Sequence, residues 1–264
     1  MTTPTTRLLY DNYGLGASWT ASSAVPTLPA SNLARAERRR VCRTVGAAAE
    51  WFAADLGVTR TVDGLALVDA NLTPAATITI EASPSDAWPG VFSASLTPWA
   101  AGDSGVLLWF LLTPQSYRWW RLSIADPSNP SGYIEIGVAM LSPRFDFLTR
   151  PGASSSPSRF TLVDPSLVEA SPIGTPYSFD LPSRWEVDVP FGALDESLVY
   201  PAFLTALRAM GRRRDGVLSA RADAPSGSPA AIERNLYGRF VDVPDLSYTD
   251  SRYYQTALRF RESR

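Results

Sequence analysis

The chain contains no histidine and no lysine, so all 24 of its basic residues are arginine. Without histidine, neither Ser-His-Asp nor Cys-His catalysis can operate, and imidazole metal sites are excluded. Without lysine, Schiff-base chemistry, Ser-Lys dyads and the phosphate-loop lysine are excluded as well. Paired carboxylates for glycoside hydrolysis and oxygen ligands for Ca²⁺ or Mg²⁺ remain. We expect a protein that is not an enzyme, and we assign no catalytic, cofactor-binding or metal-binding residue.

Cysteine is almost absent too, because Cys42 is the only one. A single cysteine excludes an intrachain disulfide and a thiolate zinc site, so we expect Cys42 to be a small buried apolar residue. No apolar run approaches the roughly 20 residues of a membrane helix, which predicts no membrane insertion. The first residues, 1–6, lack the pattern of a secretory signal, so we expect synthesis in a cytosol.

The formal net charge of −2 argues against a nucleic-acid partner, because such proteins bind phosphates with a basic surface. Two local arginine runs, 38–40 and 212–214, have two interpretations. They could bind phosphates or acidic patches on a neighbour, but a solvated face is the commoner outcome, and we expect that outcome here.

The clearest structural signal lies between residues 117 and 141. Apolar residues alternate on both sides of a turn-rich connector, which spans 126–132 and contains Pro127, Asn129, Pro130 and Gly132. The pattern predicts an antiparallel hairpin with its core positions on one face of each strand. These positions are Trp120, Leu122 and Ile124 before the connector, and Ile134, Ile136, Val138 and Met140 after it.

Further short strands are predicted at 50–55, 62–69, 76–82 and 106–112, a spacing typical of a β-sandwich. The segment 83–105 is a long polar and aromatic connection, and connections of that length are usually functional.

Residues 149–176 are rich in Pro, Gly, Ser and Ala, which predicts a linker. We therefore expect two domains, at 1–148 and 177–264. In the second, strands are expected at 184–191, 216–222, 236–243 and 253–262, and a helix within 194–210. The fold class is mainly β, with a sandwich followed by a smaller α+β domain of antiparallel sheet and one helix.

Several motifs in the first part resemble the galactose-binding-like, or discoidin-like, β-sandwich over residues 30–142. They are Asp-Leu-Gly at 55–57, Asn-Leu at 71–72, and Tyr-Arg-Trp-Trp-Arg-Leu at 117–122 leading to Gly-Tyr-Ile-Glu-Ile-Gly at 132–137. The resemblance is to versions of this fold in phage tail proteins. Residues 185–191, the expected helix and the closing segment 258–262 look like the β domain of tail-tip or distal-tail proteins.

Together these resemblances imply a structural component of a phage tail tip or baseplate that packs into a ring. Its partners would be copies of itself and other tail proteins, and its location the virion, after synthesis in the host cytoplasm. The alternative is a non-catalytic carbohydrate-binding or host-attachment module with a host glycan as partner. No acidic triplet maps onto the Ca²⁺ site that the galactose-binding-like family often carries.

Six residues are candidates for an interface or a ligand site: Trp88, Trp99, Trp119, Arg121, Asp126 and Asn129. Trp88 and Trp99 could stack on a sugar, bury in a neighbouring subunit or cap the core. Trp119 and Arg121 share the outward face of their strand, so the arginine could stack on the indole. Asp126 and Asn129 could face a ligand at the end of the sandwich, but Asx-type turns explain them better. Glu186 and Asp188 could form an acid pair, but a solvent-facing strand explains them better.

Overall fold

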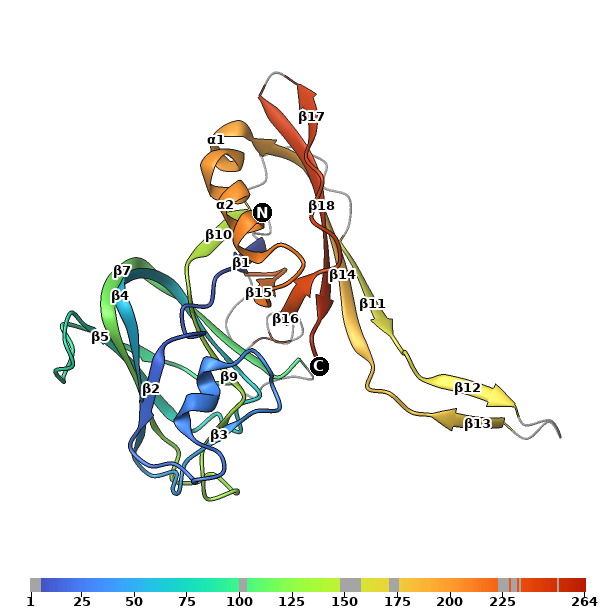
Figure 1. Cartoon of the computed structure of the whole chain (residues 1–264). Helices are drawn as coiled ribbons and strands as arrows, with labels where there is room; N and C mark the ends of the chain where they lie inside the picture. The colour runs from blue at the N-terminus through green and yellow to red at the C-terminus, as the bar shows by residue number, and fades with distance from the viewer. Residues whose placement is uncertain are drawn as a thin grey trace. The chain divides into compact units, whose positions relative to one another are not determined.

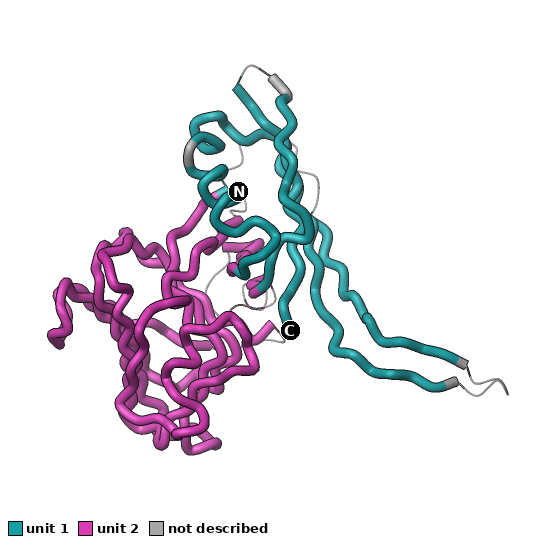
Figure 2. Tube along the Cα trace, in the orientation of Figure 1, with its two compact units in different colours: residues 1, 147–215, 238–264 teal, residues 2–146, 216–237 magenta. Residues whose placement is uncertain are grey.

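The computed structural model describes residues 6–99, 104–147, 158–170, 176–222, 228, 232, 234–250 and 252–264. The chain forms two compact units (Figure 2), and each is considered by itself. The sandwich unit comprises residues 2–146 and 216–237, and the C-terminal unit comprises 147–215 and 238–264. The chain is mainly β, as predicted (Figure 1). No described helix is long and apolar enough to cross a membrane.

The sandwich unit is built on a six-stranded antiparallel sheet, ordered β2-β4-β7-β5-β6, with β9 also paired to β4. A two-stranded sheet, β3 with β8, and the short 3-10 helix η1 belong to the same unit. The elements are β1 Thr6–Leu9, β2 Ser18–Ala21, η1 Ala30–Ala34, β3 Cys42–Arg43, β4 Glu50–Val68, β5 Thr77–Ser83, β6 Phe92–Leu96, β7 Val106–Ala125, β8 Glu135–Ile136, β9 Val138–Ser142, β10 Arg144–Phe147, β15 Gly216–Ser219 and the first half of β16 Asn235–Phe240.

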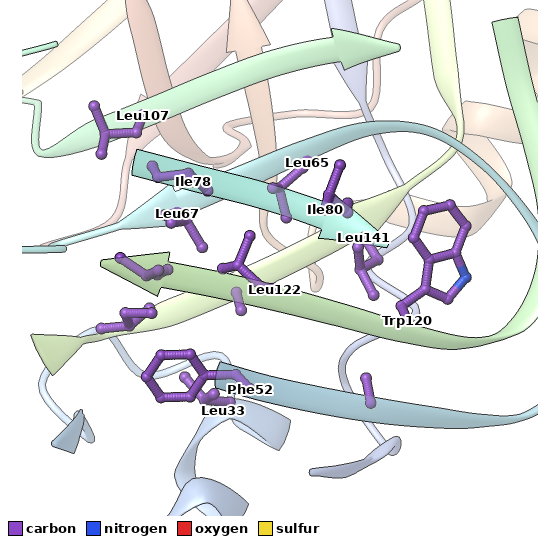
Figure 3. Close-up of a cluster of buried hydrophobic side chains, with 14 of the residues drawn as sticks. Leu33, Phe52, Leu65, Leu67, Ile78, Ile80, Leu107, Trp120, Leu122 and Leu141 are labelled. Carbon is purple, nitrogen blue, oxygen red and sulfur yellow. The ribbon is translucent and has the colours of Figure 1, made fainter. Parts of the chain in front are cut away.

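The core lies against one face of the large sheet (Figure 3). Alternation at period two directs Phe52, Leu122 and Ile80 from three neighbouring strands into it. Each fully buried side chain of this size contributes about 1.5–3 kcal/mol relative to exposure. The predicted core positions Trp120, Leu122, Ile124, Ile134, Ile136 and Val138 are all buried, and Cys42 is buried as predicted.

The predicted hairpin between residues 117 and 141 is wrong. Strand β7 pairs with β4 and β5, whereas β8 pairs with β3, and β9 pairs with β4. The connector at 126–132 therefore leads the chain from one sheet to another. The alternating apolar residues show only that each strand has a buried face, and they do not identify its partner.

Gly137 marks a second difference from the prediction, which placed Ile134, Ile136, Val138 and Met140 on the same face of one strand. Ile134 and Ile136 join the main core, whereas Val138 and Met140 join a second buried cluster. At Gly137 the backbone N–H donates to Val68 O (3.0 Å), and a Cβ here would lie 2.5 Å from Arg38 O. Only glycine fits so close an approach.

The second cluster uses residues from distant parts of the sequence. Val68, Val138 and Met140 pack there with Val217 of β15 and Tyr237 of β16. The Tyr237 hydroxyl also donates to Ala36 O (3.0 Å). Residues 216–237 thus complete the sandwich unit, which differs from the expected range 1–148.

In the C-terminal unit, β18 Tyr253–Glu262 pairs with β14 Arg184–Asp195, with residues 238–240 of β16 and with β17 Ser247–Asp250. Its helical part consists of α1 Glu196–Leu198, the π-helical turn η2 Val199–Phe203 and α2 Leu204–Met210. Phe147 packs between Phe191 (4.3 Å between ring centroids) and Phe203 (5.3 Å). Along β18, Leu258 and Phe260 are buried and the alternating arginines are more exposed, as predicted.

The segment 149–176, expected to be a linker, contains two strands among its described residues. They are β11 Arg159–Val163, paired with β14, and β12 Leu167–Ala170, paired with β13 Pro176–Phe179. Figure 1 shows β12 and β13 as a two-stranded ribbon that continues β11 and β14. We call the described residues of this part, 159–170 and 176–184, the hairpin arm. Composition alone does not reveal these strands, because strand pairing satisfies the backbone even where few side chains are buried.

Candidate functional site

The outward face of the large sheet gathers half-buried tryptophans from separate parts of the chain. Trp51 on β4 and Trp119 on β7 point away from the core, because their neighbours Phe52 and Trp120 point into it. Trp88, in the loop after β5, is half-buried as well. We call Trp51, Trp88, Trp119, Arg118 and Arg121 the outer aromatic face.

Arg121 is fixed between an acid and an aromatic ring. Its Nε and Nη2 donate to Glu81 Oε2 (2.9 and 2.7 Å) on the neighbouring strand, and its guanidinium lies 4.4 Å from the ring centroid of Trp88. Glu81 is buried and also accepts from Gly90 N (3.3 Å). Because Gly90 and Trp88 belong to one loop, Glu81 holds both the arginine and the loop that carries the indole.

Arg118 forms a second pair of the same kind. Its Nε and Nη2 donate to the two carboxylate oxygens of Asp55 (2.6 and 2.7 Å), and its guanidinium lies 5.6 Å from the Trp119 ring centroid. The hydrogen bond from Arg118 lowers the pKa of Asp55, with a smaller contribution from the Gly57 amide, against desolvation. Both arginines of the outer aromatic face are thus balanced by a carboxylate.

The predicted stacking of Arg121 on an indole occurs, but the ring is that of Trp88. Arg118, adjacent to Trp119 in the chain, approaches the Trp119 ring instead. The difference arises because the loop after β5 folds back over β7, which the spacing along β7 does not reveal.

Asp126 and Asn129 lie in the connector, and both side chains hydrogen-bond to other groups of the protein. Asp126 is fully buried and accepts from Thr73 N (2.9 Å), Thr73 Oγ1 (2.7 Å) and Asn129 Nδ2 (3.0 Å). Asn129 also donates to Asn71 O (2.9 Å) and accepts from Ser131 N (3.0 Å). The structure therefore places both residues in the turn-forming role, where they hold the connector in shape.

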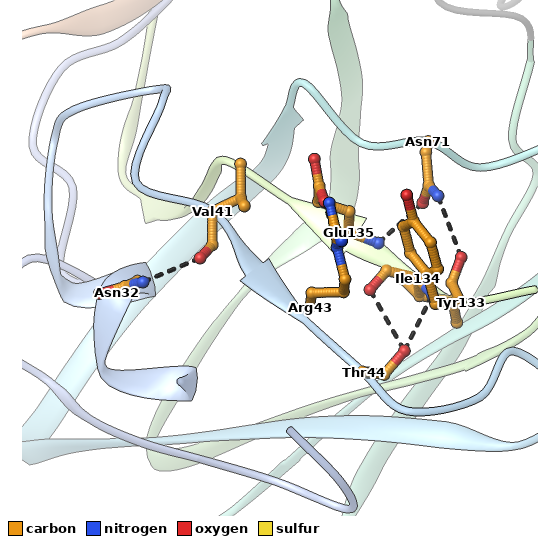
Figure 4. Close-up of polar contacts among 8 residues, drawn as sticks. All are labelled: Asn32, Val41, Arg43, Thr44, Asn71, Tyr133, Ile134 and Glu135. Atoms are coloured by element: carbon orange, nitrogen blue, oxygen red, sulfur yellow. Dashed lines mark hydrogen bonds and ion pairs between the residues drawn. The ribbon is translucent and has the colours of Figure 1, made fainter. Parts of the chain in front are cut away.

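The chain that follows the connector is fixed in the same way (Figure 4). Asn71 accepts from Glu135 N (2.7 Å) and donates to Tyr133 O (3.0 Å). Arg43 pairs with Glu135 (2.5 Å) and lies 4.2 Å from the ring centroid of Tyr133. At this end of the sandwich, Arg43 and Glu135 form an ion pair in which both side chains are partly exposed.

Trp99 belongs to the core, where its ring lies 5.5 Å from that of Trp109. It is therefore separate from the outer aromatic face. The other sequence candidates also have internal partners. Arg38 is buried and donates to Asp69 (2.7 Å through Nε) and Ser104 O (3.0 Å), so it does not lie on a solvated face, whereas Arg39 and Arg40 are exposed as predicted.

In the C-terminal unit, Glu186 pairs with Arg261 (2.6 Å) and Asp188 with Arg259 (3.2 Å). These cross-strand pairs occupy both carboxylates of the possible acid pair. Among the residues that the structure describes, no group of three or more His, Cys, Asp or Glu could hold a metal ion.

Sequence reasoning identified Trp88, Trp119 and Arg121 but missed Glu81, Asp55, Arg118 and Trp51. One signal was present, because Glu81 continues the polar positions of Thr77 and Thr79 with a carboxylate in the middle of a strand. Such a residue needs a cationic partner when it is buried.

No known protein-family model matches this chain, and no curated protein sequence matches it. Solved structures with a similar fold include chitosan-binding module 1 from a chitosanase/glucanase of Paenibacillus sp. IK-5, at 18% identity and a TM-score of 0.41, covering 51% of this chain and 99% of that one. The lectin domain of lectinolysin complexed with Lewis B antigen matches at 15% identity and a TM-score of 0.41, covering 50% and 95%. A fucose-binding module of Streptococcus pneumoniae matches at 15% identity and a TM-score of 0.40, covering 50% and 97%.

These structures are sugar-binding modules by their descriptions, and they match over about half of this chain. The sandwich unit itself consists of antiparallel sheets, as the sequence predicts. At these identities and TM-scores the similarity carries no ligand or binding residue over to this protein.

Proposed function

We propose that the sandwich unit binds a glycan without catalysis, through the outer aromatic face. The observation that carries the proposal is a set of half-buried indoles: Trp51 and Trp119 on one face of the sheet, and Trp88, whose ring contacts Arg121 of that face. Indoles are large, rigid, amphipathic surfaces that favour binding interfaces, and the C–H side of a sugar ring is a suitable apolar partner.

The charges of this face fit a neutral glycan. Arg121 is paired with Glu81 and Arg118 with Asp55, so the side chains next to the indoles are held in fixed positions and their charges are compensated. Fixed donors and acceptors lose little entropy on binding, and they can orient sugar hydroxyl groups. The proposal agrees with the absence of histidine and lysine, since binding requires neither.

A glycan array followed by titration calorimetry of the full chain tests this function. Trp88→Ala and Trp119→Ala should each weaken binding about tenfold or more, because each removes one stacking surface. Trp185→Ala, which removes a half-buried indole from the C-terminal unit, is the matched control and should bind normally. If the protein binds no glycan, or if all three variants bind equally well, the outer aromatic face is not a glycan-binding site.

A second function, compatible with the first, is favoured by the hairpin arm. Strands β12 and β13 of the arm form a separate two-stranded sheet. The arm exposes large apolar side chains, with exposed fractions of 39–73%: Leu162, Leu167, Val168, Tyr177, Phe179 and Leu181. A two-stranded hairpin is marginally stable alone, and exposed apolar surface of this kind typically marks an interface.

We infer that the chain assembles through this arm, as a structural component of a phage tail tip or baseplate that forms a ring with copies of itself. Light scattering and electron microscopy of the purified chain, alone and with tail proteins, test the assembly. Val168→Ser combined with Phe179→Ser should prevent it. A wild-type chain that stays monomeric with every tail protein tested would contradict this function and leave glycan binding untouched.

A further inference from the structure

The outer aromatic face is arranged in rows, because β4 and β7 pair without interruption between Glu50 and Asp55. Side chains two residues apart on a strand point to the same face, so every second pair lies on the outer face. Three consecutive pairs lie there, written from β4 to β7: Trp51 with Ser123, Ala53 with Arg121, and Asp55 with Trp119. The face therefore has an indole in its first row, a middle row, and an indole in its third row.

The indoles of the first and third rows are too far apart to contact one sugar ring. Trp119 lies four residues before Ser123 along β7, and Ser123 is the partner of Trp51. At about 3.3 Å per residue, the two rows are about 13 Å apart along the strands. A pyranose ring is shorter than this separation. A ligand that covers both indoles therefore places one ring on each and at least one ring between them.

The middle row provides a surface for the ring between them. Ala53 has only a methyl group as its side chain, so it does not stand above the sheet between the two indoles. Arg121, opposite Ala53, is paired with Glu81 of β5 (2.7 Å from Nη2 to Oε2). Its guanidinium lies 4.4 Å from the ring centroid of Trp88, which is half-buried. Trp88 thus brings a third indole to the middle row, and the face offers one indole for each of three rings.

Small hydroxyl side chains flank these indoles. They lie on the outer face of β2, β5, β6 and β7, and each is at least partly exposed: Ser18, Thr20, Thr79, Ser93, Ser95 and Ser123. A hydroxyl group both donates and accepts hydrogen bonds, as the hydroxyl groups of a sugar do. The charges of Arg118 and Arg121 are compensated by Asp55 and Glu81. Together these groups fit a neutral, polyhydroxylated ligand better than a charged one.

We propose that the outer aromatic face binds a neutral, linear glycan of at least three pyranose rings, running along β4 and β7 from Trp51 to Trp119. The proposal rests on the proposed glycan-binding function and adds the length and the shape of the ligand. Because the three rows follow one another along the strands, the glycan is an extended chain, as in cello-oligosaccharides. A coiled chain, as in malto-oligosaccharides, would leave one of the end indoles uncovered.

Titration calorimetry of the full chain with two extended series tests the proposal: cello-oligosaccharides and N-acetylated chito-oligosaccharides, each from the monosaccharide to the hexamer. In one of the two series, affinity should rise at least about tenfold between the dimer and the tetramer and then level off, because further rings lie beyond both end indoles. Malto-oligosaccharides of the same lengths should bind at least about tenfold more weakly.

Trp51→Ala and Trp119→Ala should change the dependence on length, since each removes the surface under one end ring. Each should lower the affinity for the tetramer about tenfold and change that for the dimer by about twofold or less, because a dimer can still use the remaining two indoles. A misfolded variant would lose affinity for every length, and its melting temperature would be lower. Ser93→Ala, at an exposed position on β6 of the same face, is the matched control and should bind normally.

The inference is overturned if neither extended series binds, if the dimer binds as tightly as the tetramer, or if the malto-oligosaccharides bind equally well. It is also overturned if both end-indole variants keep the length dependence of the wild type. The proposed function is separate, because it would still stand if a glycan array identified another ligand whose binding is lost in Trp88→Ala and Trp119→Ala. An array without any ligand would overturn both.

Discussion

The carboxylate of Asp126 accepts two hydrogen bonds from Thr73, one from the backbone N–H at 2.9 Å and one from the hydroxyl at 2.7 Å. The two residues lie 53 positions apart in the sequence. This relationship fixes the connector between β7 and β8 to the segment before β5, and it makes Asp126 a structural residue.

Replacing this carboxylate should destabilise the protein. Asp126→Ala leaves Thr73 N and Asn129 Nδ2 without their buried acceptor, and we expect a loss of about 3 kcal/mol in the free energy of unfolding. Urea denaturation measures it. Asp86→Ala, at an exposed aspartate of the same unit, should cost about 0.5 kcal/mol or less. Equal stability of the two variants would show that the hydrogen bonds of Asp126 contribute nothing.

Gly137→Ala should be costly for a steric reason. The added Cβ would lie 2.5 Å from Arg38 O and 3.0 Å from Val68 O, both backbone atoms that cannot move freely. We expect a loss of about 3 kcal/mol, measured by the same unfolding experiment. Gly132→Ala is the control, because no atom lies within 4 Å of its Cβ and only its φ of +72° is unfavourable, at about 1 kcal/mol. If Gly137→Ala loses less stability than Gly132→Ala, the steric argument is refuted.

Cys42 should be inert in the folded protein. Burial raises the pKa of its thiol to about 12, because the thiolate would lose its hydration. A thiol reagent at pH 8 should therefore label the chain only in denaturant. The folded chain keeps this proton above pH 8.5, where the unfolded chain loses it, so stability should fall as pH rises from about 8.5. Rapid labelling under native conditions would contradict the burial of Cys42.

Asp55 should titrate below the usual range of aspartate. The hydrogen bond from Arg118 lowers its pKa, so its contribution to stability is complete above the unfolded pKa of about 3.9 and is lost as pH falls through the folded value. NMR of the side-chain carboxyl carbon measures the titration. Arg118→Gln should return the pKa towards its ordinary value. An unchanged titration in that variant would mean that another group holds the carboxylate.

Much of the fold was predictable because alternation along a strand is a local property. The buried positions of β7 and β18 follow from their own sequences, and the structure confirms them. Strand partners are different, because they depend on residues far away. Gly137 changes the buried face between Ile136 and Val138, whereas the period-two pattern predicts a strand that continues through it with one buried face.

The candidate site was predictable only in part for the same reason. Trp88, Trp119 and Arg121 were recognisable as residue types, but the contact between Arg121 and Trp88 depends on a loop that Glu81 holds in place.

Because residues 216–237 belong to the sandwich unit, neither a gene fusion nor a protease can separate that unit from the rest of the chain with a single cut. A chain ending at residue 147 would lack Val217 and Tyr237, so one wall of the second buried cluster would be exposed to water. The N-terminal half therefore differs from a module that can be copied between genes as one continuous stretch. A nonsense mutation after the sandwich strands should yield an aggregating fragment, and a cut in the hairpin arm should leave both pieces of the sandwich unit held together.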